Sequence, residues 1–435
     1  MSNIIAIVGR PNVGKSTLFN RLTESRQAIV DETAGVTRDR HYGKGDWNGY
    51  EFSIIDTGGY IHGSEDVFEK EIRKQAEIAI DEADVILFVL DTMHGLTGLD
   101  LDVAKVLRQN QQKVFIVANK VDNNNLLADA TEFYSLGMGE VFSVSAINGS
   151  GTGELLDAVV KEFKDMKDEE ETDLPKFAVV GRPNVGKSSF INAIIGEERN
   201  IVTAVAGTTR DTINTRYNRY GFEFMIIDTA GIRRKSRVKE NIEFYSVLRA
   251  IRAIEKCDVS ILMVDGSQEF ESQDINILHL AEKNRKGVVV LVNKWDLVEK
   301  ETNTHKEYEE KIRRKIAPFN DVPIIFTSVL SKQRIYKAIE TGMQVYKNKT
   351  KKISGSKLNE IMLPVIKATP PPMGSRNKQI KIKYVAQLPV NFPAFAFFCN
   401  HPNEVKEQYK RFLEKKLRSA FDFNGVPIQL YFRQK

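Results

Sequence analysis

The sequence predicts an α/β protein: two domains with mainly parallel sheets and helices on both faces, followed by a smaller C-terminal α+β domain. At 435 residues the chain is too long for a single hydrophobic core. The segment GRPNVGKS at residues 9–16 returns letter for letter at residues 181–188, which indicates a duplicated domain. Short β-branched apolar runs alternate with longer amphipathic stretches, and this pattern is typical of βαβ units.

Each copy contains five apolar runs that we expect to be strands, and the chemical motifs follow their carboxyl ends, where ligands bind in open α/β sheets. In the first copy the runs are Ile4–Val8, Phe52–Ile55, Val85–Leu90, Val114–Ala118 and Val141–Val144. In the second copy they are Phe177–Val180, Phe224–Ile227, Val259–Val264, Val288–Val292 and Ile324–Thr327. The C-terminal unit is expected to hold strands at 379–386, 394–400 and 426–432 and a helix at 402–420.

Composition indicates an ordinary globular protein of a reducing compartment. The two cysteines, Cys257 and Cys399, are far apart and lack metal-binding spacing, so neither a zinc site nor a disulfide framework is indicated. The apolar run near the N-terminus has no basic region before it, and no stretch approaches the roughly 18 apolar residues that span a bilayer. We therefore expect a cytoplasmic protein that contacts neither membrane nor DNA and, since no coiled-coil heptads are present, a monomer.

Charge and composition indicate the domain boundaries. An acid-rich segment at 161–176 separates the two copies, and a basic, polar segment at 346–357 precedes the third unit. Residues 348–435 hold 17 Lys and Arg against 5 Asp and Glu, a net charge of +12 that leaves −7 for the rest of the chain. This excess favours a polyanionic partner, although a solvated lysine-rich surface would have the same composition. The expected boundaries are 1–164 for the first domain, 165–174 for an acidic linker, 175–347 for the second domain and 348–435 for the basic domain.

The repeated segment has the spacing of a phosphate-binding loop, because each copy follows an apolar run and precedes an amphipathic helical pattern. Glycines allow successive backbone amides to surround phosphates at a helix N-terminus. The lysine would reach the terminal phosphates, and the serine after it would ligate Mg²⁺. The residues predicted for this loop are Gly9, Gly14, Lys15, Ser16 and Thr17 in the first copy and Gly181, Gly186, Lys187, Ser188 and Ser189 in the second.

A second motif, Asp-Thr-(Gly/Ala)-Gly, ends an apolar run in each copy. Its carboxylate could hold Mg²⁺ through water, and the amide of its last glycine could face a γ-phosphate. A threonine in the polar loop before the motif is placed to close over Mg²⁺, as switch loops do. These residues are Thr37, Asp56 and Gly59 in the first copy and Thr209, Asp228 and Gly231 in the second, and the two threonines are predicted to act in catalysis with Lys15 and Lys187.

A third motif, Asn-Lys-x-Asp, identifies the base. Its carboxylate can accept hydrogen bonds from both N1–H and the 2-amino group of guanine, whereas adenine has an unprotonated N1 and no amino group there. GTP or GDP is therefore predicted at two sites. The lysine stem would lie along the base, the asparagine would tie the loops together, and a backbone amide after the last strand would reach guanine O6. These residues are Asn119, Lys120, Asp122, Ser145 and Ala146 in the first copy and Asn293, Lys294, Asp296, Ser328 and Val329 in the second.

Five features follow one another in the same order in both copies: the phosphate-binding loop, the loop threonine, Asp-x-x-Gly, Asn-Lys-x-Asp and the serine pair after the last strand. Together with the basic C-terminal unit, they resemble the Der (EngA) family of bacterial tandem GTPases over essentially the whole chain. The resemblance implies two G domains of the TRAFAC class, GTP hydrolysis, and a role in maturing the large ribosomal subunit with its RNA as a partner. The alternative function is a nucleotide-gated module that recruits protein partners and has little intrinsic turnover.

We expect hydrolysis to be slow and stimulated by potassium. Many small GTPases place a glutamine after Asp-x-x-Gly to orient the attacking water, and here that position holds Tyr60 and Ile232. Asn12 and Asn184 lie where similar GTPases carry an asparagine that helps to bind a catalytic K⁺. That role follows from the resemblance, and an asparagine that only braces the loop is the alternative.

Two basic features could contact RNA. Arg233, Arg234 and Lys235 follow Gly231 and could form a cis arginine finger, an RNA contact or a mobile, solvated switch. The C-terminal unit resembles the KH-like domain of Der proteins but lacks the Gly-x-x-Gly loop that clamps a nucleic-acid backbone. The unit could dock against the G domains or contact ribosomal RNA, and its basic side chains could equally form an ordinary exposed helix face: Lys406, Lys410, Arg411, Lys415, Lys416 and Arg418.

Overall fold

The computed structural model describes residues 3–24, 42–56, 83–109, 113–123, 125–165, 174–195, 204–205, 214–227, 250–299, 303–374 and 378–434. The chain divides into two compact units, residues 1–171 and 172–435. Several residues predicted to act at the sites lie outside the described residues: Thr37, Gly59, Tyr60, Thr209, Asp228, Gly231, Ile232, Arg233, Arg234 and Lys235.

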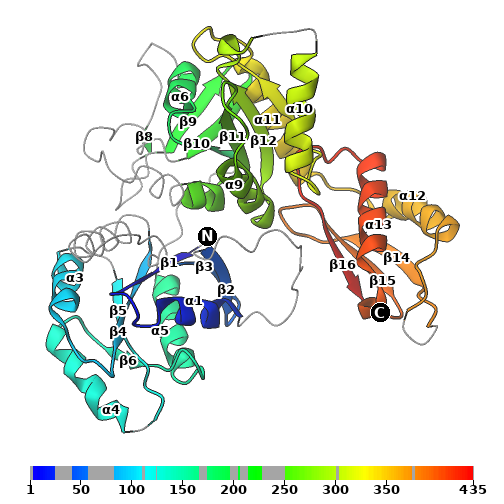
Figure 1. The fold of residues 1–435 in the computed structure, drawn as a ribbon. Coiled ribbons are helices and arrows are strands. Elements are labelled where there is room, and N and C mark those ends of the chain that lie inside the picture. The colour runs from blue at the N-terminus through cyan, green and yellow to red at the C-terminus, as the bar shows by residue number, and fades with distance from the viewer. Residues whose placement is uncertain are drawn as a thin grey trace. The chain divides into compact units, whose positions relative to one another are not determined.

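The first unit is built on a six-stranded sheet in the order β2-β3-β1-β4-β5-β6 (Figure 1). Its neighbouring strands are parallel except for the β2–β3 pair. Every residue of the central strand β4 is buried, as expected for a parallel strand covered on both faces. The elements are β1 (Asn3–Val8), α1 (Lys15–Glu24), β2 (Tyr42–Trp47), β3 (Tyr50–Asp56), β4 (Val85–Asp91), α3 (Gly98–Arg108), β5 (Lys113–Asn119), α4 (Leu126–Asp129), η2 (Ala130–Leu136), β6 (Val141–Ser143) and α5 (Thr152–Asp165).

The second unit begins with a seven-stranded sheet in the order β13-β12-β11-β7-β10-β9-β8. β7, β10, β11, β12 and β13 pair in parallel, whereas β8 and β9 are antiparallel additions at one edge. The elements are β7 (Lys176–Val180), α6 (Lys187–Ile195), β8 (Ala204–Val205), β9 (Asn214–Arg219), β10 (Phe222–Ile227), β11 (Val259–Asp265), α9 (Ser272–Lys283), β12 (Gly287–Asn293), η3 (Trp295–Leu297), α10 (Thr304–Lys315), β13 (Ile324–Phe326) and α11 (Ile335–Thr350).

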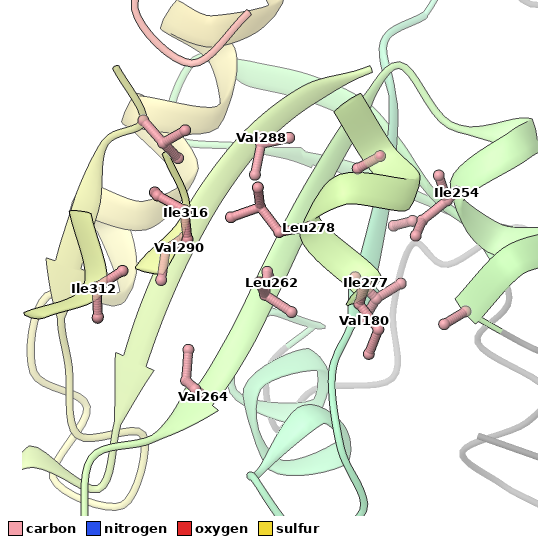
Figure 2. Close-up of a cluster of buried hydrophobic side chains, with 14 of the residues drawn as sticks. Val180, Ile254, Leu262, Val264, Ile277, Leu278, Val288, Val290, Ile312 and Ile316 are labelled. Atoms are coloured by element: carbon pink, nitrogen blue, oxygen red, sulfur yellow. The ribbon is translucent and has the colours of Figure 1, made fainter. Parts of the chain in front are cut away.

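A continuous apolar cluster covers one face of this second sheet. Figure 2 shows Leu278 of α9 beside Leu262 of β11 and Val288 of β12, all of them at most 1% exposed. Ile312 and Ile316, at the end of α10, belong to the same cluster. Burial of this kind contributes roughly 1.5–3 kcal/mol per large side chain. The cluster therefore stabilises the sheet whose carboxyl edge carries the motifs.

The C-terminal part of the second unit is a three-stranded sheet, β14-β15-β16, packed against two helices (Figure 1, orange to red). β14 and β15 are antiparallel, and α13 connects β15 to the parallel strand β16. The elements are α12 (Gly355–Ala368), β14 (Ile382–Gln387), β15 (Ala394–Cys399), η5 (Pro402–Glu404), α13 (Glu407–Ala420) and β16 (Gln429–Arg433).

Polar contacts join this C-terminal part to the part of the same unit that contains the seven-stranded sheet. The backbone amide of Val288 donates to the carbonyl of Gly425 at 2.7 Å, and Asp321 accepts from Asn424 at 2.9 Å and from Arg418 at 3.3 Å. Arg418 also donates to two backbone carbonyls of the C-terminal part. Of the six basic side chains named for RNA contact, Arg418 therefore serves the joint between the two parts.

The predicted fold class is confirmed, and a strand is found at each predicted apolar run, although β6 and β13 end one residue earlier than predicted and β14 and β16 begin three residues later. The sequence prediction missed the antiparallel strands β2, β8 and β9 and the helix α12. The predicted helix at 402–420 is a 3₁₀ turn followed by α13. In the part of the chain that the structure describes, no helix has the length and apolar character needed to cross a membrane.

Candidate guanine-nucleotide sites

The lysine of each phosphate-type loop is folded back onto the loop backbone. Lys15 Nζ donates to the carbonyl oxygens of Gly9 and Arg10, both at 2.8 Å. Lys187 Nζ makes the same two contacts in the second copy, at 2.7 Å to the carbonyl of residue 181 and 2.5 Å to that of residue 182. Lys15 is 6% exposed, and burial lowers its pKa to about 8. Because burial penalises the ammonium, a bound anion would offset that penalty.

One asparagine connects the phosphate-type loop of the first copy to the loop after β6. Asn119 Nδ2 donates to the carbonyl of Val13 at 2.8 Å, and its Oδ1 accepts from the amide of Ala146 at 3.0 Å. A Cβ atom on Gly14 would lie 2.3 Å from Asn119 Nδ2, and the φ of Gly14 is +94°. Glycine is therefore required at this point of the loop.

The second copy repeats this connection. Asn293 donates to the carbonyl of Val185 at 2.8 Å and accepts from the amide of Val329 at 3.0 Å. Gly186 has a φ of +103°, and a Cβ there would lie 2.3 Å from Asn293 Nδ2. The same junction is thus built in both copies, although the residue after the last strand is Ala146 in the first and Val329 in the second.

The amides predicted to reach guanine O6 are the ones that these asparagines engage. In the structure the amides of Ala146 and Val329 donate to Asn119 and Asn293. Each would have to share its hydrogen to contact a base, so the O6 contact remains a prediction. The next side chains, Ile147 and Leu330, are 70% and 91% exposed and border the same place.

The carboxylate predicted to read the base is held differently in the two copies. Ser145 Oγ donates to Asp122 Oδ1 at 2.5 Å. In the second copy the corresponding hydroxyl, Ser328 Oγ, accepts from the amide of Ser331 at 3.3 Å. Asp122 therefore has a fixed orientation through a contact that Asp296 does not share among the described residues.

The sequence prediction missed two acids beside the base-recognition motif. Lys120 Nζ donates to Asp91 at 2.7 Å, and Lys294 Nζ donates to Asp265 at 2.6 Å. Burial alone would raise the pKa of Asp91, but hydrogen bonds from Lys120 and His94 outweigh it and hold that pKa below its usual value. Both acids end fully buried strands and are 174 residues apart, the spacing of the two Asn-Lys-x-Asp motifs, and this was the signal that could have found them.

Two oxygen donors suited to Mg²⁺ meet in the first copy. Ser16 Oγ donates to Asp56 Oδ2 at 2.7 Å, and Asp56 is fully buried at the end of β3. Hydroxyl and carboxylate oxygens are the ligands that Mg²⁺ prefers, with its remaining positions filled by water and phosphate. Among the described residues no group of three or more His, Cys, Asp and Glu could hold a metal by itself. The pair therefore fits a magnesium ion that is bound together with a nucleotide.

The predicted potassium residues share an unusual backbone conformation. Asn12 and Asn184 have φ angles of +65° and +62°, and both side chains are exposed. Asparagine adopts this left-handed region more readily than most residues. Thr17 and Ser189, in the first turns of α1 and α6, are likewise exposed.

The fold and the repeated loops define a P-loop GTPase with two G domains. The family model described as "50S ribosome-binding GTPase" matches residues 4–120 and 176–294, and a model described as "KH-domain-like of EngA bacterial GTPase enzymes, C-terminal" matches residues 352–433. The chain is 61% identical over 435 residues to GTPase Der of Christiangramia forsetii, 60% over 436 residues to that of Flavobacterium johnsoniae and 56% over 438 residues to that of Porphyromonas gingivalis. Each alignment covers 100% of both chains. The chain belongs to the GTPase Der family.

Membership settles the general activity and cofactors. A GTPase of this family hydrolyses GTP and uses a guanine nucleotide with Mg²⁺. The first copy has a described residue at each position predicted for such a site: the loop lysine, the serine–aspartate pair and the carboxylate predicted to read the base.

Proposed function

We propose that both G domains bind GTP and that the chain is a nucleotide-switched assembly factor for the large ribosomal subunit. The observation that carries this proposal is the duplication itself: the asparagine junction recurs with the same distances in both copies. In each copy the asparagine leaves no room for a side chain at the loop glycine. If one copy had lost nucleotide binding, we would not expect both the asparagine and that glycine to be retained in it.

In the proposed mechanism, backbone amides of residues 9–16 and 181–188 surround the phosphates, and Lys15 and Lys187 neutralise the terminal ones. Ser16, Asp56 and their counterparts Ser188 and Asp228 would hold Mg²⁺, which neutralises charge on the β- and γ-phosphates when it is bound. Thr37 and Thr209 would close over it. Asp122 and Asp296 would select guanine, with Lys120 and Lys294 along the base.

We propose that intrinsic turnover is slow and that potassium raises it. Tyr60 and Ile232 have no side-chain amide that could orient the attacking water as glutamine does, so part of that task falls to other groups. Asn12 and Asn184 expose side-chain oxygens beside the phosphate-type loop, and a monovalent cation held there could stabilise charge that develops on the phosphates.

The proposed partner is the large ribosomal subunit and its RNA, and the proposed form is a cytoplasmic monomer. The basic charge of residues 348–435 supports a polyanionic partner. The domain boundaries stay as proposed at 1–164, 175–347 and 348–435, although α11 continues to Thr350. For Arg233 and Arg234 the three alternatives stay as predicted from the sequence: a finger, an RNA contact or a solvated switch.

Co-sedimentation tests the assembly role. The purified chain is mixed with large ribosomal subunits in the presence of GDP, a non-hydrolysable GTP analogue, or no nucleotide. We expect binding that depends on the nucleotide, with RNA crosslinks in residues 348–435. If no ribosomal particle binds in any state, the assembly role is wrong, and crosslinks to proteins alone would favour the recruitment module.

A further inference from the structure

An arginine of each phosphate-type loop forms an ion pair with an aspartate in a neighbouring helix. Arg10 Nε lies 3.2 Å from Asp100 in α3, and Arg182 Nε lies 3.1 Å from Asp274 in α9. The guanidinium groups are mostly buried, and both aspartate side chains are fully buried. The same pair has been built twice, between residues 90 or more positions apart in sequence.

The aspartate is a rigid anchor because it is also part of the helix N-terminus. Asp100 Oδ2 accepts from the backbone amide of Thr97 at 3.1 Å and from the Thr97 hydroxyl at 2.8 Å, and the Asp100 amide donates back to that hydroxyl. Asp274 accepts from the amide of Glu271 at 3.1 Å in the same capping arrangement. These contacts complete the capping box without any arginine, so capping does not explain why a loop arginine is buried beside the acid.

The arginine backbone is in turn a support of the phosphate-binding lysine. The carbonyl oxygens of Gly9 and Arg10 each accept from Lys15 Nζ, so the direction of the lysine depends on where residue 10 lies. The Arg10 side chain ties that residue to α3. The chain of contacts therefore runs from the helix, through the ion pair and the loop backbone, to the lysine.

We propose that Arg10 and Arg182 are positioning residues, which fix the phosphate-binding lysines by fastening their own backbone carbonyls to Asp100 and Asp274. This inference rests on the proposed nucleotide sites. Lysine reaches the terminal phosphates of the nucleotide, so the loss of the anchor should weaken binding of nucleotides that have a β-phosphate and spare GMP.

The two anchors differ in strength. Arg182 also contacts Glu271 at 2.6 Å and donates to the carbonyl of Glu269 at 3.3 Å. In the first copy Arg10 Nη2 and Asp100 Oδ1 are buried without a hydrogen-bond partner among the described residues. More of the second loop's position should therefore depend on its arginine.

Titration calorimetry with GDP and GMP on the full chain tests this proposal. Lys187→Ala isolates the first site, Lys15→Ala isolates the second, and the double substitution gives the baseline. In the isolated first site, Arg10→Gln should weaken GDP about tenfold, within the range of coupling between contacting residues. GMP should change less than about twofold. Asp100→Asn keeps the acceptor for Thr97 and should have the same effect, with no further loss in the double substitution.

Arg108→Gln is the matched control, because Arg108 lies at the other end of α3 and donates to the carbonyl of Leu136. It should leave GDP affinity unchanged. In the isolated second site Arg182→Gln should cost more GDP affinity than Arg10→Gln costs in the first, and Glu271→Gln should cost less than either.

Three results would overturn the proposal: wild-type GDP affinity in folded Arg10→Gln, equal weakening of GDP and GMP, or additive losses for Arg10→Gln and Asp100→Asn. If Arg10→Gln does not unfold cooperatively on heating, the nearly isosteric Asp100→Asn carries the test alone. If the Lys15→Ala and Lys187→Ala double variant binds GDP as tightly as the wild type, the proposed nucleotide sites are wrong. That result can be told apart from a failure of the arginine proposal, because it does not involve the arginine variants.

Discussion

The two G domains share the contacts of the loop lysine and of the connecting asparagine. They differ in the contacts that other side chains make to residues of the predicted nucleotide sites. In both copies the lysine binds two loop carbonyls, and the asparagine connects the same two loops. The differences lie in the side chains that support residues of the predicted sites. Ser145 orients Asp122 only in the first copy, and Glu271 reinforces Arg182 only in the second.

The loop lysines and the connecting asparagines keep the same contacts in both copies, whereas the side chains that support neighbouring carboxylates differ. His94 contacts Asp91 in the first copy, whereas Ser267 contacts Asp265 in the second. A histidine and a serine thus serve the same purpose, since each contacts the aspartate that accepts a hydrogen bond from the lysine of Asn-Lys-x-Asp. The two sites should therefore bind the same ligand with different strengths and respond differently to the same substitution.

The largest expected effect tests whether both sites turn over. Lys15→Ala and Lys187→Ala should each remove the turnover of one site, with a loss of about 100-fold or more at that site because a preorganised charge at the phosphates is lost. GTP hydrolysis measured in KCl and in NaCl should show potassium-dependent activity that the double substitution abolishes. Activity that survives in the double variant would contradict the proposed lysine roles.

A smaller effect is expected for base recognition. Asp122→Asn removes charge-assisted hydrogen bonds of about 1.5–3 kcal/mol from the first site. The introduced amide can instead donate to the C2 carbonyl of xanthine, so the first site should then prefer XDP. Asp296→Asn should act in the same way on the second site. Competition binding with GDP and XDP checks both, and an unchanged preference in either variant would show that the residue does not read the base.

Substitution of Ser145 and of Ser328 tests whether the carboxylate of Asn-Lys-x-Asp is held differently in the two copies. Ser145→Ala should weaken GDP at the first site by about 1 kcal/mol, the net contribution of one hydrogen bond, because Asp122 loses its orienting donor. Ser328→Ala should leave the second site nearly unchanged, since among the described residues Ser328 Oγ accepts from a backbone amide, as Ser145 Oγ also does, but makes no hydrogen bond to Asp296. Equal losses at the two sites would remove this distinction.

The stability of the β2–β3 hairpin should also distinguish the copies. Asp157 of α5 accepts from Trp47 at 2.7 Å and from Asn48 at 3.0 Å. At the corresponding place of the second unit, Tyr220 packs edge-on against Tyr336. Asp157→Ala should lower the stability of the first unit by about 1 kcal/mol in thermal unfolding, and Glu340→Ala, which removes an exposed pair with Lys337, should cost about 0.5 kcal/mol or less.

The weakest effect that we predict is a change in how the free energy of unfolding depends on pH under acidic conditions. Lysine contacts hold the pKa of Asp91 and Asp265 below the usual value, against the opposing effect of burial. A carboxyl whose folded-state pKa is lowered contributes stability above its unfolded pKa, near 3.9, and loses it as the pH falls through the folded value. Urea unfolding between about pH 3 and 5 should therefore show a shallower loss for Asp91→Asn and Asp265→Asn than for the wild type. Identical slopes would contradict this prediction.

The sequence alone was sufficient for the parts of the molecule that local patterns determine. Parallel strands buried on both faces are short continuous apolar runs, so β4 and β11 could be located directly. Motif spacing could place Lys15 and Asn119 at the same sheet edge, because parallel strands present their carboxyl ends together.

Other features depend on contacts between residues that are far apart in the sequence, so they became visible in the fold. β2 contains Gly43 and Gly45, where a Cβ would lie 2.2 Å from Thr23 and 2.6 Å from Phe52, so close packing removed the apolar residues that would have marked a strand. Arg10 and Asp100 are 90 residues apart, and neither has a local pattern that names the other. Such pairs are set by burial and by distance in space, because an ion or a polar group withdrawn from water needs whichever partner the fold brings next to it.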